Sequence, residues 1–169
     1  HGTPSGIDNT VIAFGKPLYF VRGEQAEVFS PGNPLWLVIA DTGVSASTRR
    51  VVAAVRQRWQ AEREAYEGRF DAIGALVKRA RAAIQSSDLP LLGQLMDENQ
   101  SLLAEIGVSS PRLERLIAAA RGAGALGAKL SGSGRGGNMI ALVEQQGASA
   151  VADALVAAGA RKVITTCVS

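Results

Sequence analysis

The sequence predicts an α+β fold in which helices cover one face of a mostly antiparallel sheet. Its elements follow the order strand, helices, strand, strand, helix, strand, which is the order that such an open sandwich needs. Continuous apolar runs indicate the strands, and apolar residues at helical spacing indicate the helices. The chain has 169 residues, of which 47% are hydrophobic and 20% charged, so it is long enough for one sizeable core.

A domain boundary is predicted early in the chain. Residues 30–34, Ser-Pro-Gly-Asn-Pro, form a strong loop signal. Before them come a loop that enters a helix and a short hairpin with strands at 18–21 and 26–29. We therefore expect residues 1–33 to be the end of one domain and residues 34–169 to form another.

The elements of the second domain follow from apolar periodicity and from the residues that interrupt it. Trp36 and Trp59 fit the core, and Ser109 or Ser110 is expected to cap the helix that begins at Pro111. The expected elements are a strand at 35–40, helices from about 47, at 70–84, at 88–105 and at 111–121, strands at 125–130 and 138–143, a helix at 147–158 and a strand at 162–168.

Composition excludes several classes of function. The net charge of +3 comes from arginines scattered among acids, which argues against a nucleic-acid partner. Cys167 and His1 are the only residues of their types, which argues against a disulfide within the chain and against a structural zinc site. No apolar run approaches the roughly 18 residues of a membrane span, so we expect no membrane partner. The single cysteine suits a reducing compartment, and we expect a cytoplasmic protein. The chain begins inside a motif without methionine, and we interpret it as the C-terminal portion of a longer protein.

The run His1-Gly-Thr-Pro-Ser-Gly-Ile-Asp-Asn9 is the strongest local signal. Ser5 and Asp8 form a variant of the capping box at the start of a helix, which is the commoner use of such a pair. A carboxylate in the same place can also orient a substrate hydroxyl and accept its proton as it attacks phosphorus.

This run resembles the segment that carries the catalytic aspartate in mevalonate kinases, members of the GHMP small-molecule kinase superfamily. The resemblance implies that Asp8 is the catalytic base and that His1 and Ser5 line the substrate pocket. It also implies ATP and Mg²⁺ as cofactors, and a ferredoxin-like C-terminal domain, which agrees with the fold class predicted above.

A second signal is the glycine-rich loop after Lys129. Taken alone, it is either an anion-binding nest of backbone N–H groups or a tight connection between two strands. It resembles the third GHMP motif, which implies that it lies on the phosphate side of the active site. Arg135 replaces a glycine of that motif and either contacts phosphate or points to solvent, and we favour solvent. The implied loop residues are Ser131, Gly132, Ser133, Gly134, Arg135, Gly136 and Gly137.

Two further stretches resemble the same family. In residues 41–50 the resemblance implies that Thr48 and Arg49 shape the substrate pocket, although a helix cap with solvated arginines explains them too. In residues 96–109, Asp97 and Gln100 face either the cleft or solvent.

The function implied by the resemblance is ATP-dependent phosphorylation of mevalonate. The main phosphate-binding loop of the family, its Mg²⁺ ligands and its active-site lysine are not found in these 169 residues. We therefore expect the isolated chain to be inactive and to need the N-terminal half of the same protein as its partner, in a possible homodimer. The alternatives are another GHMP kinase that acts on phosphomevalonate or a sugar, and a non-catalytic ferredoxin-like domain for binding or dimerisation.

Overall fold

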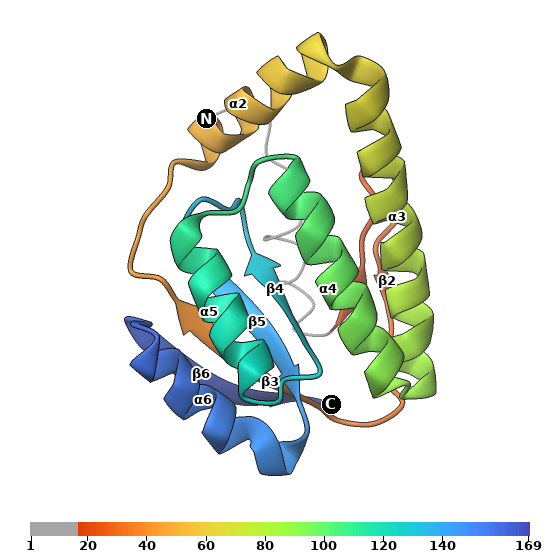
Figure 1. Ribbon diagram of the computed structural model, residues 1–169. Coiled ribbons are helices and arrows are strands. Elements are labelled where there is room, and N and C mark those ends of the chain that lie inside the picture. Colours follow the sequence, from red (N-terminus) through yellow and green to blue (C-terminus); the bar gives the residue numbers. More distant parts are fainter. Residues whose placement is uncertain (1–16) are drawn as a thin grey trace.

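The computed structural model describes residues 17–169, and in them the helices and strands confirm the α+β class (Figure 1). The elements are β1 (Leu18–Tyr19), β2 (Glu27–Val28), β3 (Leu35–Asp41), α2 (Thr48–Ala61), α3 (Arg63–Ser86), α4 (Leu89–Glu105), α5 (Pro111–Gly122), β4 (Gly127–Ser131), β5 (Asn138–Val143), the 3-10 turn η1 (Gln145–Gly147), α6 (Ala148–Ala157) and β6 (Lys162–Val168).

The main sheet is antiparallel throughout, with its strands in the order β4-β5-β3-β6. Its first strand in the chain, β3, is central and lies between β5 and β6, while β4 and β6 form the edges. The sheet combines two halves, each with a strand, one or more helices and a strand: β3 to β4, and β5 to β6. The strands of the two halves alternate in the sheet, as in the ferredoxin-like arrangement. The expected sheet is therefore confirmed.

The larger core lies between one face of this sheet and helices α5 and α6. Side chains alternate between the two faces along a strand, so every second residue of β3 and β5 points to this core. Most of those residues are fully buried, and so are the helical residues that meet them, while Trp36 is partly buried. The cluster includes Val38, Ala40, Met139, Ala141, Leu113, Leu116, Ile117, Ala120, Val151 and Leu155.

A second cluster joins α3 and α4 to the sheet. It contains Leu35 and Leu142, which alternate with the residues of the first cluster along β3 and β5 and so belong to the opposite face. Figure 1 shows α4 beside α5, with α3 running along the outer side of α4. The α3–α4 pair thus extends the helical layer around the edge strand β4.

Two glycines allow α4 to approach β4 closely. A Cβ atom at Gly93 would overlap the carbonyl group of Leu126, and one at Gly127 would overlap the backbone of Gly93. Any larger residue at either position would push the helix away from the strand.

Side chains of α4 consequently reach the free edge of β4. Asp97 Oδ1 accepts a hydrogen bond of 2.8 Å from Ala128 N, and Gln100 Oε1 accepts one of 2.9 Å from Leu130 N. Arg121 Nη2 donates to the Ala128 carbonyl over 3.0 Å. An edge strand exposes backbone groups that need partners, and here the neighbouring helices supply them.

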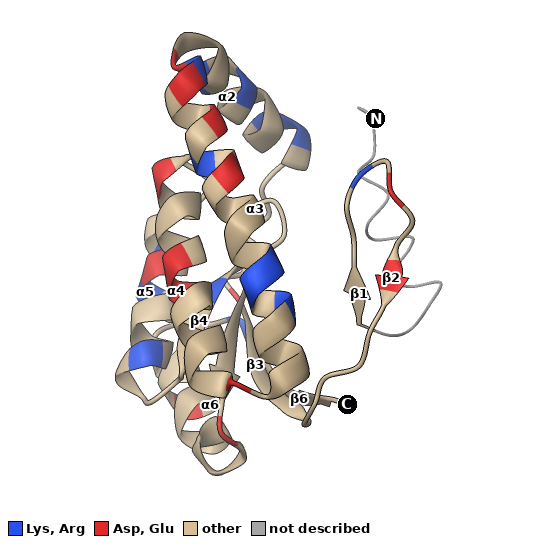
Figure 2. Cartoon of the chain, turned by 90° about the vertical axis from the view of Figure 1, so that its right-hand side faces the viewer, with Lys and Arg blue, Asp and Glu red and all other residues tan. Residues whose placement is uncertain are grey.

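The expected hairpin is confirmed, with two residues in each strand, and it forms a sheet of its own. It stands beside α3, apart from the main sheet (Figure 2). Arg81 of α3 holds it there. The Arg81 guanidinium pairs with Glu27 at 2.6 Å and lies 4.6 Å from the centre of the Tyr19 ring.

The predicted start of α3 at about residue 70 is wrong, because the helix begins at Arg63. Its first turns are mostly polar, so apolar periodicity does not reveal them. An Arg63–Glu67 ion pair of 2.8 Å, one helical turn apart, supports them instead. Tyr66 is the one apolar anchor within these turns, and it is buried.

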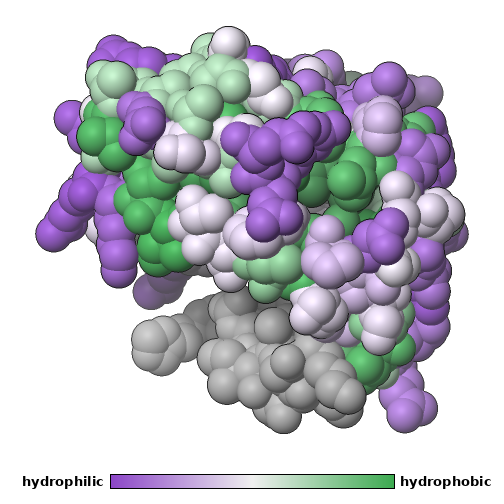
Figure 3. All heavy atoms as spheres, turned by 90° about the horizontal axis from the view of Figure 1, so that it is seen from below, coloured by the Kyte–Doolittle hydropathy of each residue, from purple (hydrophilic) through white to green (hydrophobic). Residues whose placement is uncertain are grey.

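The surface keeps some apolar residues. In the part of the chain that the structure describes, Val52 and Val156 are 59% and 60% exposed. Figure 3 shows hydrophobic residues on one face in separate patches between hydrophilic ones. Among residues 17–169 none of the helices is both long and apolar enough to span a membrane.

Candidate functional site

Three connecting segments meet at one end of the main sheet. They are 42–47 after β3, 106–110 between α4 and α5, and the glycine loop between β4 and β5. Backbone hydrogen bonds join them: Thr42 N donates to Gly137 O over 2.9 Å and Gly137 N donates to Val44 O over 2.8 Å. On the other side Arg135 N donates to Val108 O over 2.6 Å. The glycine loop is therefore fixed between two neighbouring segments.

The glycine loop has an unusual backbone. Gly132, Gly134 and Gly137 have φ of 93°, 82° and 70°, and Arg135 has φ of 57°. Backbone of this kind is favourable for glycine, and glycine loops with such backbone can form anion-binding nests. A Cβ atom at Gly134 would overlap the Val108 carbonyl. Close packing as well as conformation thus requires glycine there.

Arg135 does not extend freely into solvent, contrary to the orientation favoured from the sequence. Its Nε donates to Gly107 O over 3.0 Å, and the residue is half-buried. Gly107 follows the C-terminal end of α4, where backbone carbonyls lack helical partners. The arginine satisfies one of these carbonyls and joins the loop to the α4–α5 connection.

The first turn of α2 lies against the same loop. Thr48 Oγ1 donates to Ser133 Oγ over 3.2 Å. Ser47 is the N-cap residue, but its side chain makes no capping hydrogen bond. Arg49 is exposed in the same turn, as is Arg50. The structure therefore brings Thr48 and the loop together at a helix N-terminus, a place that favours anions.

Three of the predicted site residues, His1, Ser5 and Asp8, lie outside the described residues 17–169. Their roles stay predictions.

Sequence reasoning missed the role of Gln100, which is 2% exposed. Its Nε2 donates to Ser109 Oγ over 3.1 Å and to Glu114 Oε1 over 2.8 Å, while its Oε1 accepts from Leu130 N. Gln100 thus faces β4 and the α4–α5 connection, and its interpretation as a solvated residue is wrong. The helical i, i+3 spacing from Asp97 to Gln100, set beside an edge strand, is the signal that could have revealed it.

The capping prediction is resolved in favour of Ser110. Ser110 is the N-cap residue of α5, and its side chain accepts from Leu113 N over 3.4 Å. Ser109 instead donates to Glu114 Oε1.

Mg²⁺ prefers carboxylate oxygens together with water and phosphate oxygens. Among residues 17–169, no group of three or more His, Cys, Asp or Glu side chains is placed to hold a metal ion. The glycine loop itself contains no carboxylate. The described residues therefore do not fit a Mg²⁺ site of their own.

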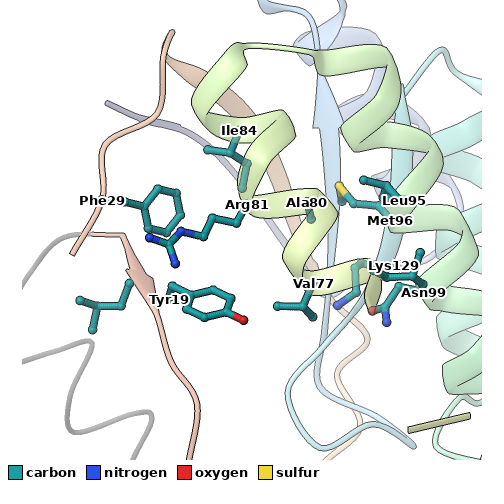
Figure 4. Close-up of a pocket in the computed structure, with 12 residues that line it drawn as sticks. Tyr19, Phe29, Val77, Ala80, Arg81, Ile84, Leu95, Met96, Asn99 and Lys129 are labelled. Carbon is teal, nitrogen blue, oxygen red and sulfur yellow. The ribbon is translucent and has the colours of Figure 1, made fainter. Parts of the chain in front are cut away.

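A pocket of about 250 Å³ lies between the hairpin, α3 and α4 (Figure 4). Arg81 lies between Tyr19 and Phe29 at one end, while Asn99 and Lys129 lie at the other. Lys129 Nζ donates to Leu130 O over 3.0 Å. Burial in these mostly apolar surroundings lowers the pKa of the Lys129 ammonium group, because the charged form loses hydration.

Comparison with known proteins gives a consistent result. Residues 80–161 match the model of the GHMP kinases C-terminal family. The mevalonate kinases of Pyrococcus abyssi and Pyrococcus horikoshii are each 41% identical over 169 residues, which is 97% of this chain and 50% of each relative. The chain thus spans about half the length of these relatives.

A solved structure extends the similarity to the three-dimensional arrangement. The crystal structure of L. major mevalonate kinase in complex with R-mevalonate has a TM-score of 0.93 and 36% sequence identity. The match covers 100% of this chain and 54% of that one. With the family match, the identity to relatives and the shared fold in agreement, the chain belongs to the GHMP kinase family and carries its C-terminal domain.

Proposed function

We propose that the protein containing this chain transfers the γ-phosphoryl group of ATP to the hydroxyl group of mevalonate. The observation that carries the proposal is the similarity, over the whole chain, to a mevalonate kinase crystallised with R-mevalonate. The two archaeal relatives, also named mevalonate kinase, support the same substrate.

The glycine loop 131–137 is proposed to line the phosphate side of the site. Its succession of positive φ angles and its place beside the N-terminus of α2 support this role. Phosphoryl transfer depends on positioning and charge stabilisation more than on covalent chemistry. A loop held in place by its neighbours suits that demand, because it needs little rearrangement when the phosphate binds.

Thr48 and Arg49 are proposed to contact the substrate from the first turn of α2. Asp8 is proposed to orient the mevalonate hydroxyl and accept its proton, with His1 and Ser5 in the pocket wall. Mg²⁺ would neutralise charge on the phosphates. Since the described residues do not fit a Mg²⁺ site, we propose that its ligands come from the N-terminal half of the same protein.

Residues 1–33 are proposed to belong to that N-terminal domain, and residues 34–169 to form the C-terminal one. The hairpin supports this division, because it forms a sheet separate from the main one. An isolated two-stranded sheet is at best marginally stable, so further strands beside it would stabilise it. We accordingly propose that the 169-residue chain is inactive alone.

The test is ADP release by the complete protein in the presence of MgATP, with and without mevalonate. Release that depends on mevalonate would establish the reaction. A folded protein that binds ATP and responds instead to phosphomevalonate or a sugar would refute the substrate, and a protein that does not bind ATP would refute the kinase. The same assay on the isolated chain should give no release above background.

A further inference from the structure

We propose that Gln100 is a positioning residue, which holds the glycine loop 131–137 by hydrogen bonds both to the strand that leads into the loop and to the α4–α5 connection that supports it. Gln100 lies on α4 and is not part of the loop. Both polar atoms of its side chain are nonetheless hydrogen-bonded, to Leu130 of β4, to Ser109 of the α4–α5 connection and to Glu114 of α5.

The first of these segments is the strand that leads into the loop. Gln100 Oε1 accepts from Leu130 N, and Leu130 directly precedes Ser131, the last residue of β4 and the first of the predicted loop residues. Because β4 is an edge strand, this amide points away from β5 and needs a partner outside the sheet. Gln100 therefore fixes the position from which the loop departs.

The second segment is the α4–α5 connection, on which the middle of the loop rests. Gln100 Nε2 donates to Ser109 Oγ, and Ser109 is the neighbour of Val108. The carbonyl groups of Val108 and Gly107 accept from Arg135 N and Arg135 Nε, respectively. One side chain thus sets the distance between the strand before the loop and the support beneath it.

Only a side-chain amide serves this arrangement. Leu130 needs an acceptor, whereas Glu114 needs a donor, and glutamine presents one of each from a single planar group. Gln100 is 2% exposed, so water does not readily replace a lost bond. A carboxylate at position 100 would face the carboxylate of Glu114.

Asp97 provides a matched comparison. It lies one helical turn earlier on α4, accepts from Ala128 N over 2.8 Å and pairs with Arg121 at 2.7 Å. It therefore fastens α4 to β4 much as Gln100 does. In the structure its side-chain bonds go to β4 and α5, and none goes to the glycine loop or to its support at 107–109.

The experiment compares Gln100→Met with Asp97→Asn in the complete protein, each at the same number of degrees below its own unfolding midpoint. Amide hydrogen exchange is measured over residues 132–137 without substrate, and the KM for ATP is measured separately. Gln100→Met should speed exchange of the loop amides and raise the KM for ATP, each by about tenfold or more. Asp97→Asn should change each by less than about twofold. Equal loop exchange in the two variants would overturn the proposal.

A second test, which does not need Gln100→Met to fold, swaps the amide of Gln100 with the carboxylate of Glu114. Gln100→Glu should loosen the loop, because two carboxylates then face each other. Adding Glu114→Gln restores a donor opposite an acceptor and should return loop exchange to within about threefold of the original rate. A double variant no better than Gln100→Glu alone would contradict the proposal.

The kinetic part of this inference rests on the proposed function, whereas the exchange part does not. A protein without kinase activity would refute the proposed function and leave the exchange comparison as the test of Gln100. A kinase with unchanged loop exchange in Gln100→Met would refute the role of Gln100 alone.

Discussion

The hydroxyl group of Thr48 donates a hydrogen bond of 3.2 Å to that of Ser133, 85 positions later in the chain. The bond joins the first turn of α2 to the glycine loop. It lies on the surface, where one hydrogen bond contributes little to folding because water competes for both partners. Its consequence is positional: it sets the N-terminus of α2 beside the proposed phosphate site.

Replacing Thr48 with Val keeps the side-chain shape and removes the donor. We expect the free energy of unfolding to change by less than about 1 kcal/mol, as for a single exposed bond. In the complete protein, kcat/KM for mevalonate should fall about tenfold, the equivalent of 1.4 kcal/mol in the transition state. Steady-state kinetics and urea unfolding measure the two effects. Ser47→Ala is the control. It should preserve both the free energy of unfolding and kcat/KM, because the Ser47 side chain makes no capping bond. An unchanged kcat/KM in Thr48→Val would exclude Thr48 from the site.

A comparison of Gly134 with Gly132 distinguishes two reasons why a position requires glycine: a positive φ angle and a lack of space for a Cβ atom. Both have positive φ, but only at Gly134 would a Cβ atom also overlap a neighbour, the Val108 carbonyl. Gly132→Ala should cost about 1–2 kcal/mol of stability from backbone strain. Gly134→Ala should cost about 1–3 kcal/mol more, because loop and support must move apart. Urea unfolding measures the loss of stability in each variant. Equal losses in the two variants would mean that Gly134 does not pack tightly against Val108.

Lys129 should make stability depend on pH in the alkaline range. Burial lowers its pKa in the folded state, so between that pKa and the ordinary lysine value of about 10.4 the unfolded chain binds more protons. The free energy of unfolding therefore rises with pH between these two pKa values. Below the folded-state pKa, Lys129 is charged in both states, so the cost of burying its charge does not depend on pH. Lys129→Met should be more stable than the original protein at neutral pH, and its advantage should shrink toward pH of about 10.

Urea unfolding from neutral to alkaline pH measures this difference for the two proteins in parallel. Titration of other groups affects both proteins alike and cancels in the difference. Lys162→Met is a suitable control, since Lys162 is exposed on β6. An advantage of Lys129→Met that stays constant with pH would show that Lys129 keeps an ordinary pKa.

Much of the fold could be predicted from the sequence, because local signals fix it. The strands 138–143 and 162–168 match the structure residue for residue. Each is rich in apolar and β-branched residues and lies next to a turn with a positive-φ glycine, at Gly137 and Gly159. The start of α3 was missed because its first turns are mostly polar and depend on the Arg63–Glu67 ion pair, with Tyr66 as their one buried apolar residue.

The connections within the site could not be predicted in the same way. Gln100 and Arg135 act through hydrogen bonds to the backbone of segments distant in the chain. Such bonds leave no periodicity, and glutamine or arginine on a polar stretch resembles any solvated residue. The loop itself was found because several closely spaced glycines are a local signal. What holds the loop depends on the packing of α4 against β4, which only the fold reveals.

Asp8 carries the last prediction, which distinguishes catalysis from helix capping. Asp8→Asn in the complete protein removes the charge and keeps a side chain that caps helices about equally well. If the carboxylate accepts the mevalonate proton, kcat should fall by a factor of about 10² to 10⁴, with little change in the thermal midpoint. Mevalonate-dependent ADP release and thermal unfolding, measured on the same preparation, give both quantities. A variant that keeps kcat within about threefold of the original would assign Asp8 to the cap, since a general base cannot be replaced by a neutral amide without a large loss of rate.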